Sequence, residues 1–105
     1  MTETWIDAAG AEDIDLEDVI RFDHEGKIYA LYRTADDRYF ATAGLCTHQR
    51  VSLADGLVMG TLIECPKHNG RFDFTTGEPK RLPACLPLAT FPVKVEDGRV
   101  KLRLA

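Results

Sequence analysis

The sequence predicts an all-β fold, an antiparallel β-sandwich or barrel that carries a small inserted lobe. The first 43 residues hold four stretches rich in β-branched and aromatic side chains, spaced by about ten residues. Two more stretches with alternating polarity, joined by Asp97-Gly98, lie near the end of the chain. Residues 44–77 between these parts carry five glycines and read mostly as loops, which predicts a lobe of different character.

The expected strands of the first part span residues 4–8, 19–23, 27–33 and 38–43. Residues 9–18 contain Gly10 and an acidic run, which is typical of an exposed connection. His24-Glu25-Gly26 predicts a hairpin turn between the second and third strands. Asp36-Asp37 is expected to turn the chain into the fourth strand.

Inside the lobe, residues 61–64 and 71–74 are strand-like. Residues 78–88 contain three prolines, which predicts a stiff segment without regular structure. We expect this segment to form one wall of the metal-binding site that the lobe is predicted to carry, as described below. The stretches 91–95 and 99–104 are expected to form a hairpin whose last strand returns to the first sheet. We therefore expect one domain over residues 1–105, with a β base formed by 1–43 and 89–105 and a lobe over about 44–77.

Charge is unevenly distributed along the chain. The net charge is −4, yet residues 1–20 contain seven acidic residues and all thirteen Lys and Arg residues come later. This acidic start is either a solvated loop or part of a negatively charged surface that docks a basic partner. It argues against nucleic-acid binding. No apolar run approaches the ~20 residues of a membrane span, and the first residues lack a signal-peptide pattern. We expect a cytoplasmic protein with no membrane partner.

Two short segments of the lobe carry residues that bind metals. Cys46-Thr47-His48 has the pattern C-x-H, and Cys65-Pro66-Lys67-His68 has the pattern C-x-x-H. Thiolates and imidazoles suit zinc and iron. Two Cys and two His also make a structural zinc set, but zinc fingers usually pair like ligands, and each segment here mixes Cys with His. The arrangement favours a [2Fe–2S] centre in which histidines replace cysteines on one iron.

Neighbouring residues fit this interpretation. Pro66 restricts the backbone on both sides of it and stiffens the second segment, and Gly70 is expected to allow a tight exit from it. Cys85 is a third cysteine without a partner, expected to be a buried small hydrophobe or else an oxidisable thiol. His24 is expected to be a solvated turn residue.

Both segments, together with residues 69–73 and 87–98, resemble the Rieske family. The short chain resembles the soluble Rieske ferredoxins of bacterial ring-hydroxylating oxygenases. The resemblance implies one [2Fe–2S] cluster per chain, with Cys46 and Cys65 on the inner iron and His48 and His68 on the outer iron. It implies an electron-transfer component without catalytic residues of its own. Such a protein carries single electrons from an NAD(P)H-dependent flavoprotein reductase to a terminal oxygenase, here of the aromatic-ring dioxygenase type.

Two other functions stay open at this point: a small Rieske-like subunit of an assimilatory nitrite reductase, and a structural or redox-sensing module. The second iron site of a terminal oxygenase is not expected, because only His24 remains after the four ligands are assigned. The segments lack the extra cysteines of respiratory Rieske proteins. We therefore predict a midpoint potential in the lower part of the roughly −150 to +300 mV range. Arg50, Lys67 and Arg71 either steer docking or are solvent-facing charges without a role in recognition.

Overall fold

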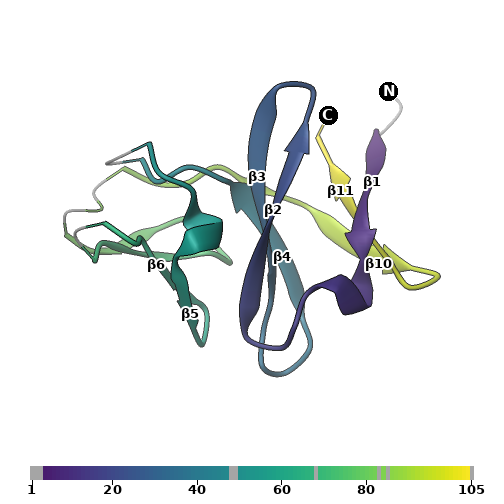
Figure 1. Ribbon diagram of the computed structural model, residues 1–105, viewed down its shortest axis with the longest axis horizontal. Coiled ribbons are helices and arrows are strands. Elements are labelled where there is room, and N and C mark those ends of the chain that lie inside the picture. The colour runs from purple at the N-terminus through teal and green to yellow at the C-terminus, as the bar shows by residue number, and fades with distance from the viewer. Residues whose placement is uncertain (1–3, 48–49, 68, 83, 85, 105) are drawn as a thin grey trace.

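The computed structural model describes residues 4–47, 50–67, 69–82, 84 and 86–104. Three antiparallel sheets form three layers, with one sheet in the middle (Figure 1). This arrangement confirms the predicted all-β, antiparallel class.

The sheets are defined by their strand order. The outer base sheet has the order β1 (Trp5–Gly10), β11 (Arg99–Arg103), β10 (Val93–Glu96). The central sheet has the order β2 (Asp18–His24), β3 (Lys27–Arg33), β4 (Tyr39–Ala43), β9 (Thr90–Phe91). The third sheet has the order β5 (Leu57–Met59), β6 (Leu62–Glu64), β7 (Arg71–Asp73), β8 (Pro79–Arg81). Two short 3₁₀ helices, η1 (Ala11–Asp13) and η2 (Leu53–Asp55), lie in connections.

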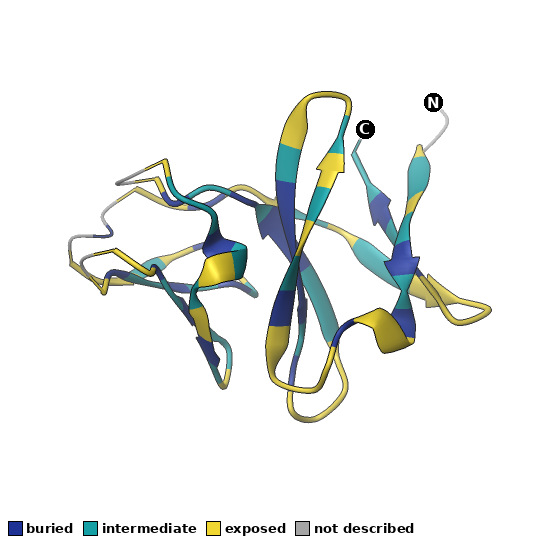
Figure 2. Cartoon of the chain, viewed as in Figure 1, coloured by how far each residue is buried: buried dark blue, intermediate teal, exposed yellow. Residues whose placement is uncertain are grey.

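The central sheet is buried on both faces, which explains the continuous apolar character of β3. Tyr29 and Leu31 pack toward the outer base sheet, whereas Ala30 and Tyr32 belong to the core cluster beneath the third sheet. Successive side chains of a strand point to opposite faces, so β3 contributes to both cores at once. Figure 2 shows this strand as buried through its middle.

Both predicted hairpin turns have the expected backbone. Glu25 and Gly26 have φ of 49° and 79°, and Asp97 and Gly98 have φ of 52° and 73°. Two successive positive φ values are those of a type I′ turn, whose twist matches that of the flanking strands.

The structure also corrects several expectations. Residues 78–88 were expected to lack regular structure, yet β8 begins at Pro79 and pairs with β7 at the edge of the third sheet. An edge strand tolerates proline because its outer N–H positions need no partner. The stretch 91–95 is interrupted at Pro92, so that β9 pairs with β4 and β10 pairs with β11. Strand β5 was not predicted.

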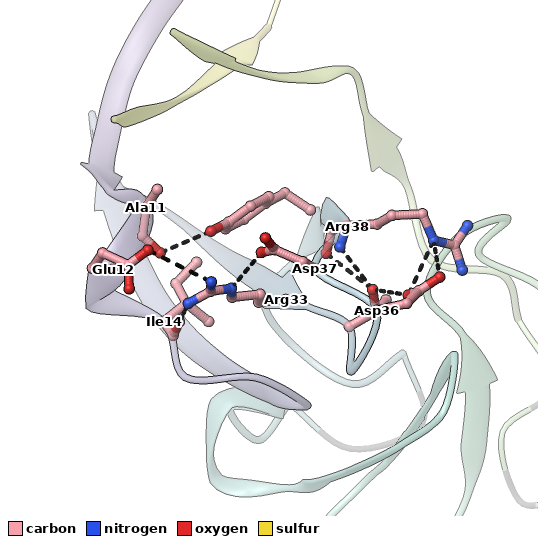
Figure 3. A network of polar contacts seen from close by, with 9 residues as sticks. Ala11, Glu12, Ile14, Arg33, Asp36, Asp37 and Arg38 are labelled. Atoms are coloured by element: carbon pink, nitrogen blue, oxygen red, sulfur yellow. Dashed lines mark hydrogen bonds and ion pairs between the residues drawn. The ribbon is translucent and has the colours of Figure 1, made fainter. Parts of the chain in front are cut away.

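A polar network fastens the two loops that follow β1 and β3 (Figure 3). The Arg33 guanidinium donates to the Ile14 carbonyl at 2.9 Å and to the Asp37 carboxylate at 2.8 Å. The Tyr39 hydroxyl donates to the Ala11 carbonyl at 3.0 Å. These bonds satisfy backbone carbonyls that no strand partner reaches.

Aromatic side chains join the third sheet to the central sheet. The rings of Phe74 and Tyr32 stack with centroids 4.2 Å apart and an interplanar angle of 1°. Both side chains are fully buried, and the Tyr32 hydroxyl hydrogen-bonds the Thr42 hydroxyl at 2.9 Å. Phe74 therefore packs at the junction between the third sheet and the central sheet. Within the described residues, no helix has the length and apolar character needed to cross a bilayer.

Candidate metal centre

The two predicted ligand segments are loops closed in the same way. The Cys46 amide donates to the Val51 carbonyl at 3.0 Å, and the Cys65 amide donates to the Gly70 carbonyl at 2.7 Å. Each loop therefore begins at a cysteine and is closed by a bond to the carbonyl five residues later. A bridge between Leu45 and Ser52 supports the first loop, and the β6–β7 pairing supports the second.

The two cysteines lie together in the core of the lobe. Cys46 is 3% exposed and Cys65 is 1% exposed, and both are free thiols in the same buried cluster as Phe72. The pKa of Cys65 is raised to about 11, mainly by burial and to a smaller extent by the neighbouring Cys46 thiol, while a hydrogen bond from the Lys67 backbone amide opposes the rise. Two thiols from separate loops therefore meet at one buried point.

His48 and His68, the other two predicted ligands, lie outside the described residues, as does Cys85. The described residues contain no group of three metal-binding side chains, because only the two cysteines of the predicted set are among them.

A third loop, residues 82–88, contacts both ligand loops. The Thr47 hydroxyl donates to the Leu86 carbonyl at 2.8 Å. A Cβ added at Gly70 would lie 3.0 Å from the Ala84 nitrogen, so Gly70 allows the third loop to approach the second ligand loop. The described residues of this segment therefore lie against both ligand loops, and its role as one wall of the site stays a prediction. The role predicted for Gly70 was different: the left-handed residue before the loop's exit is Asn69, with φ of 57°.

The ends of the second ligand loop are joined by an ion pair. Glu64 and Arg71 are direct neighbours across β6 and β7, and their side chains pair at 2.9 Å. Steering of partners was one of the two roles open for Arg71, but this pairing with Glu64 occupies its guanidinium. The sequence could not reveal this, because the two residues become neighbours only through strand register.

A half-open cavity of about 650 Å³ lies beside the first ligand loop. Its lining includes Cys46, Thr47 and Arg50 from the loop, and Lys27 and Tyr29 from β3. The hairpin between β2 and β3 therefore shares a surface recess with the ligand loop, a proximity that the sequence did not predict.

The donor set fits an iron–sulfur centre. Two buried thiols at adjacent points can supply two thiolates to one metal, since coordination removes the thiol proton outright. The low exposure of both cysteines keeps water away from their sulfur atoms.

A β base that holds two symmetric cysteine loops defines a small iron–sulfur electron-transfer domain. The family model described as "Rieske [2Fe-2S] domain" matches residues 4–92. The chain belongs to the Rieske [2Fe-2S] domain family, whose cofactor is a Rieske-type [2Fe–2S] cluster.

Relatives agree in sequence and structure. The ferredoxin component of the naphthalene 1,2-dioxygenase system of Pseudomonas aeruginosa is 44% identical over 105 residues, covering 100% of both chains. The solved Sphingomonas yanoikuyae B1 ferredoxin superposes with a TM-score of 0.91, at 34% identity over 97% of this chain and 100% of that one. The ferredoxin in a complex with the oxygenase of carbazole 1,9a-dioxygenase gives a TM-score of 0.89 at 34% identity, covering 97% of this chain and 94% of that chain.

These matches confirm the resemblance to dioxygenase ferredoxins and the class of electron-transfer component rather than enzyme. Two structures described as putative nitrite reductase small subunits are only 16% and 20% identical and show the fold alone.

Proposed function

We propose that this protein is the ferredoxin component of an aromatic-ring dioxygenase system. It accepts single electrons from an NAD(P)H-dependent flavoprotein reductase and delivers them to a terminal oxygenase in the cytoplasm. Full-length identity of 44% to a ferredoxin component of a naphthalene dioxygenase system supports this function over a nitrite reductase subunit. The observation that carries the proposal is the pair of buried thiols, Cys46 and Cys65, brought together by two identically closed loops.

We propose Cys46, His48, Cys65 and His68 as the four ligands. The bound [2Fe–2S] cluster supplies a reversible one-electron store. The protein contributes a dry pocket for the thiolates, formed by Phe72 and the third loop. Pairing of Glu64 with Arg71 holds the two ends of the second loop together, which limits rearrangement between redox states.

Electron paramagnetic resonance of the dithionite-reduced protein tests the site. We expect a Rieske spectrum that is lost in His48→Ala and in His68→Ala. A spectrum typical of all-cysteine [2Fe–2S] centres, or a colourless protein holding zinc, would contradict the assignment.

Reconstitution tests the role. NADH, a flavoprotein reductase, this protein and the oxygenase component of a naphthalene 1,2-dioxygenase system are combined, and dihydroxylated product is measured. Product should form only when this protein is present. Failure to support turnover, by a protein that carries the cluster and is reduced by the reductase, would argue against the proposed role.

A further inference from the structure

Most basic side chains of the protein are neutralised by carboxylates. Counting partners among the described residues, eight of the thirteen Lys and Arg residues form an ion pair, and Arg103 lies over the Trp5 ring. The eight are Arg21, Arg33, Arg38, Arg71, Lys80, Lys94, Arg99 and Lys101. Four cations form no ion pair with any carboxylate in the part of the chain that the structure describes: Lys27, Arg50, Lys67 and Arg81.

These four cations surround the candidate metal centre. Arg50 belongs to the first ligand loop and Lys67 to the second. Arg81 ends β8, where the third loop begins, and Lys27 lines the same cavity as Arg50 and Cys46. All four are exposed. We call them the cationic rim.

Carboxylates gather elsewhere. Glu12, Asp13, Asp15 and Glu17 lie on η1 and the connection to β2, and Asp18 is the first residue of β2. Of these five, Glu12 is paired with Arg33. This acidic segment runs along the lower edge of Figure 1, away from the described parts of the ligand loops at the left. Asp13 and Glu17 accept hydrogen bonds from the Gly10 and Gly60 amides, which leaves their charges in place. Near the rim, Glu25 lines the cavity beside His24, and Glu64 is held by Arg71.

The described charged side chains beside the ligand loops are therefore mainly basic, although the whole chain carries −4. Charges farther apart than a Debye length, about 8 Å at physiological salt, are largely screened from one another. A partner in contact with the ligand loops accordingly encounters the rim and not the acidic segment. Unpaired cations also keep a stronger field than cations already bound to a carboxylate.

The third loop adds apolar surface beside the rim. Leu82 is 76% exposed and Leu86 is 59% exposed, which is unusual for two leucines in one short loop. An apolar patch bordered by charge is the common anatomy of a transient protein interface.

We propose that the cationic rim docks this protein onto an acidic patch of its terminal oxygenase, with Leu82 and Leu86 in apolar contact. This inference rests on the proposed function and adds the chemistry of the partner surface. Attraction between the rim and carboxylates orients the metal centre toward the oxygenase, while the acidic segment repels the same patch when the protein arrives in the opposite orientation.

Anaerobic stopped-flow spectroscopy tests the proposal. Dithionite-reduced protein is mixed with the oxidised oxygenase component of a naphthalene 1,2-dioxygenase system, and reoxidation is followed from low to high salt. We expect the second-order rate constant of the wild type to fall as ionic strength rises. Because electrostatic steering changes association rates by roughly 10- to 1,000-fold, R50Q/K67Q/R81Q should be at least about tenfold slower at low salt, with a flattened salt dependence.

A matched variant separates local charge from net charge. R21Q/R38Q/R99Q also removes three cations and also changes the formal net charge from −4 to −7. Its three arginines are exposed, lie on the base, and are already paired with carboxylates. It should stay within about twofold of the wild type, because pairing and distance screen these charges.

The outcomes are distinguishable. Removing cations near the cluster lowers its midpoint potential and makes the reduced protein a stronger donor, so slower transfer in the rim variant reflects docking. Equal rates for the rim variant and the wild type, or a wild-type rate that rises with salt, overturn the docking proposal and leave the electron-transfer function intact. A wild type that carries the cluster but does not reduce the oxygenase contradicts the proposed function and the docking proposal together.

Discussion

Phe74 offers a sharp test of how the lobe is held on the base. Its ring is 1% exposed, stacks on Tyr32 and packs at 5.7 Å from the Phe40 ring. It also belongs to the buried cluster that contains both cysteines. Replacing Phe74 by Ala removes a side chain that packs between the third sheet and the central sheet, in the same buried cluster as Cys46 and Cys65.

The expected cost follows from these contacts. Truncating a buried Phe to Ala typically costs about 3–5 kcal/mol, and stacked aromatic pairs contribute about 0.5–1.5 kcal/mol beyond burial. Because Phe74 is fully buried and stacked, we expect the upper part of that range for Phe74→Ala. Phe74→Leu keeps most of the apolar volume and should cost only about 1–2 kcal/mol. A loss of this size is a large fraction of the 5–15 kcal/mol that stabilises an ordinary domain.

Two optical probes distinguish local unfolding of the ligand loops from global unfolding of the protein. Trp5, the only tryptophan, lies on β1 of the outer base sheet, whereas the absorbance of the cluster reports the ligand loops. Anaerobic unfolding of the cluster-loaded protein in guanidinium chloride is followed by both signals. In the wild type we expect the two transitions to coincide; in Phe74→Ala the cluster signal should be lost at lower denaturant than the Trp5 signal.

Phe22→Ala is the matched control. Phe22 packs in the other core cluster, on the side of the outer base sheet. Its truncation should shift the Trp5 transition without separating the cluster signal ahead of it. Coincident transitions in Phe74→Ala, or a loss of stability no larger than in Phe74→Leu, would refute the assigned role of the aromatic junction.

Three further predictions concern the loops. Gly44→Ala should lower the iron content per chain, because the added Cβ would lie 2.9 Å from β3 backbone carbon atoms and displace the first ligand loop; iron analysis checks this. The Thr34 hydroxyl and the Arg38 guanidinium lower the pKa of Asp36, so its stabilising contribution is present above the ordinary carboxyl pKa of about 3.9 and is lost as pH falls below it. The melting temperature of Asp36→Asn should therefore decline less between pH 5 and pH 2 (about the range in which carboxylates titrate) than that of the wild type. Redox titration should place the midpoint potential in the lower part of roughly −150 to +300 mV, because hydroxyl hydrogen bonds to the cluster sulfurs, which raise the potential, are not expected here. The Thr47 hydroxyl donates to the Leu86 carbonyl instead, and residues 64–74 hold no hydroxyl side chain. A value near the upper end of the range would contradict this.

Local chemistry made much of the fold predictable. The Asp97-Gly98 turn was predicted because few residue pairs adopt two positive φ values, and the Glu25-Gly26 turn because a Gly-containing segment separates two strand-like runs. The two cysteines were identified by their spacing from histidines, and they lie together in the structure. Strand β8 was missed because its proline argues against a strand except at a sheet edge, and edge position is a property of the assembled sheet.

The sequence predicted only part of the rim: it pointed to Arg50 and Lys67, wrongly grouped Arg71 with them, and missed Lys27 and Arg81, for a related reason. Arg71 and Lys67 look alike as basic residues close to ligands, but only Arg71 lies opposite a carboxylate, because β6 and β7 pair in the register that joins it to Glu64. Lys27 is nineteen residues before Cys46 and shares a cavity with it only through the packing of the β2–β3 hairpin. Whether a charge is available to a partner depends on tertiary neighbours, whereas the residue type alone decides only its sign.

Stability and recognition therefore depend on different residues around the same centre. The thiols and aromatic rings of the lobe are buried in one cluster, where a change of volume is costly and the partner makes no contact. The rim cations are exposed and form no ion pair within the described residues, so exchanging them costs the fold little. This separation implies that the partner preference of the protein can be altered at Lys27, Arg50, Lys67 and Arg81 while the cluster is retained, although its midpoint potential falls as cations are removed. A rim variant that lost its cluster would show instead that the two sets of residues are coupled.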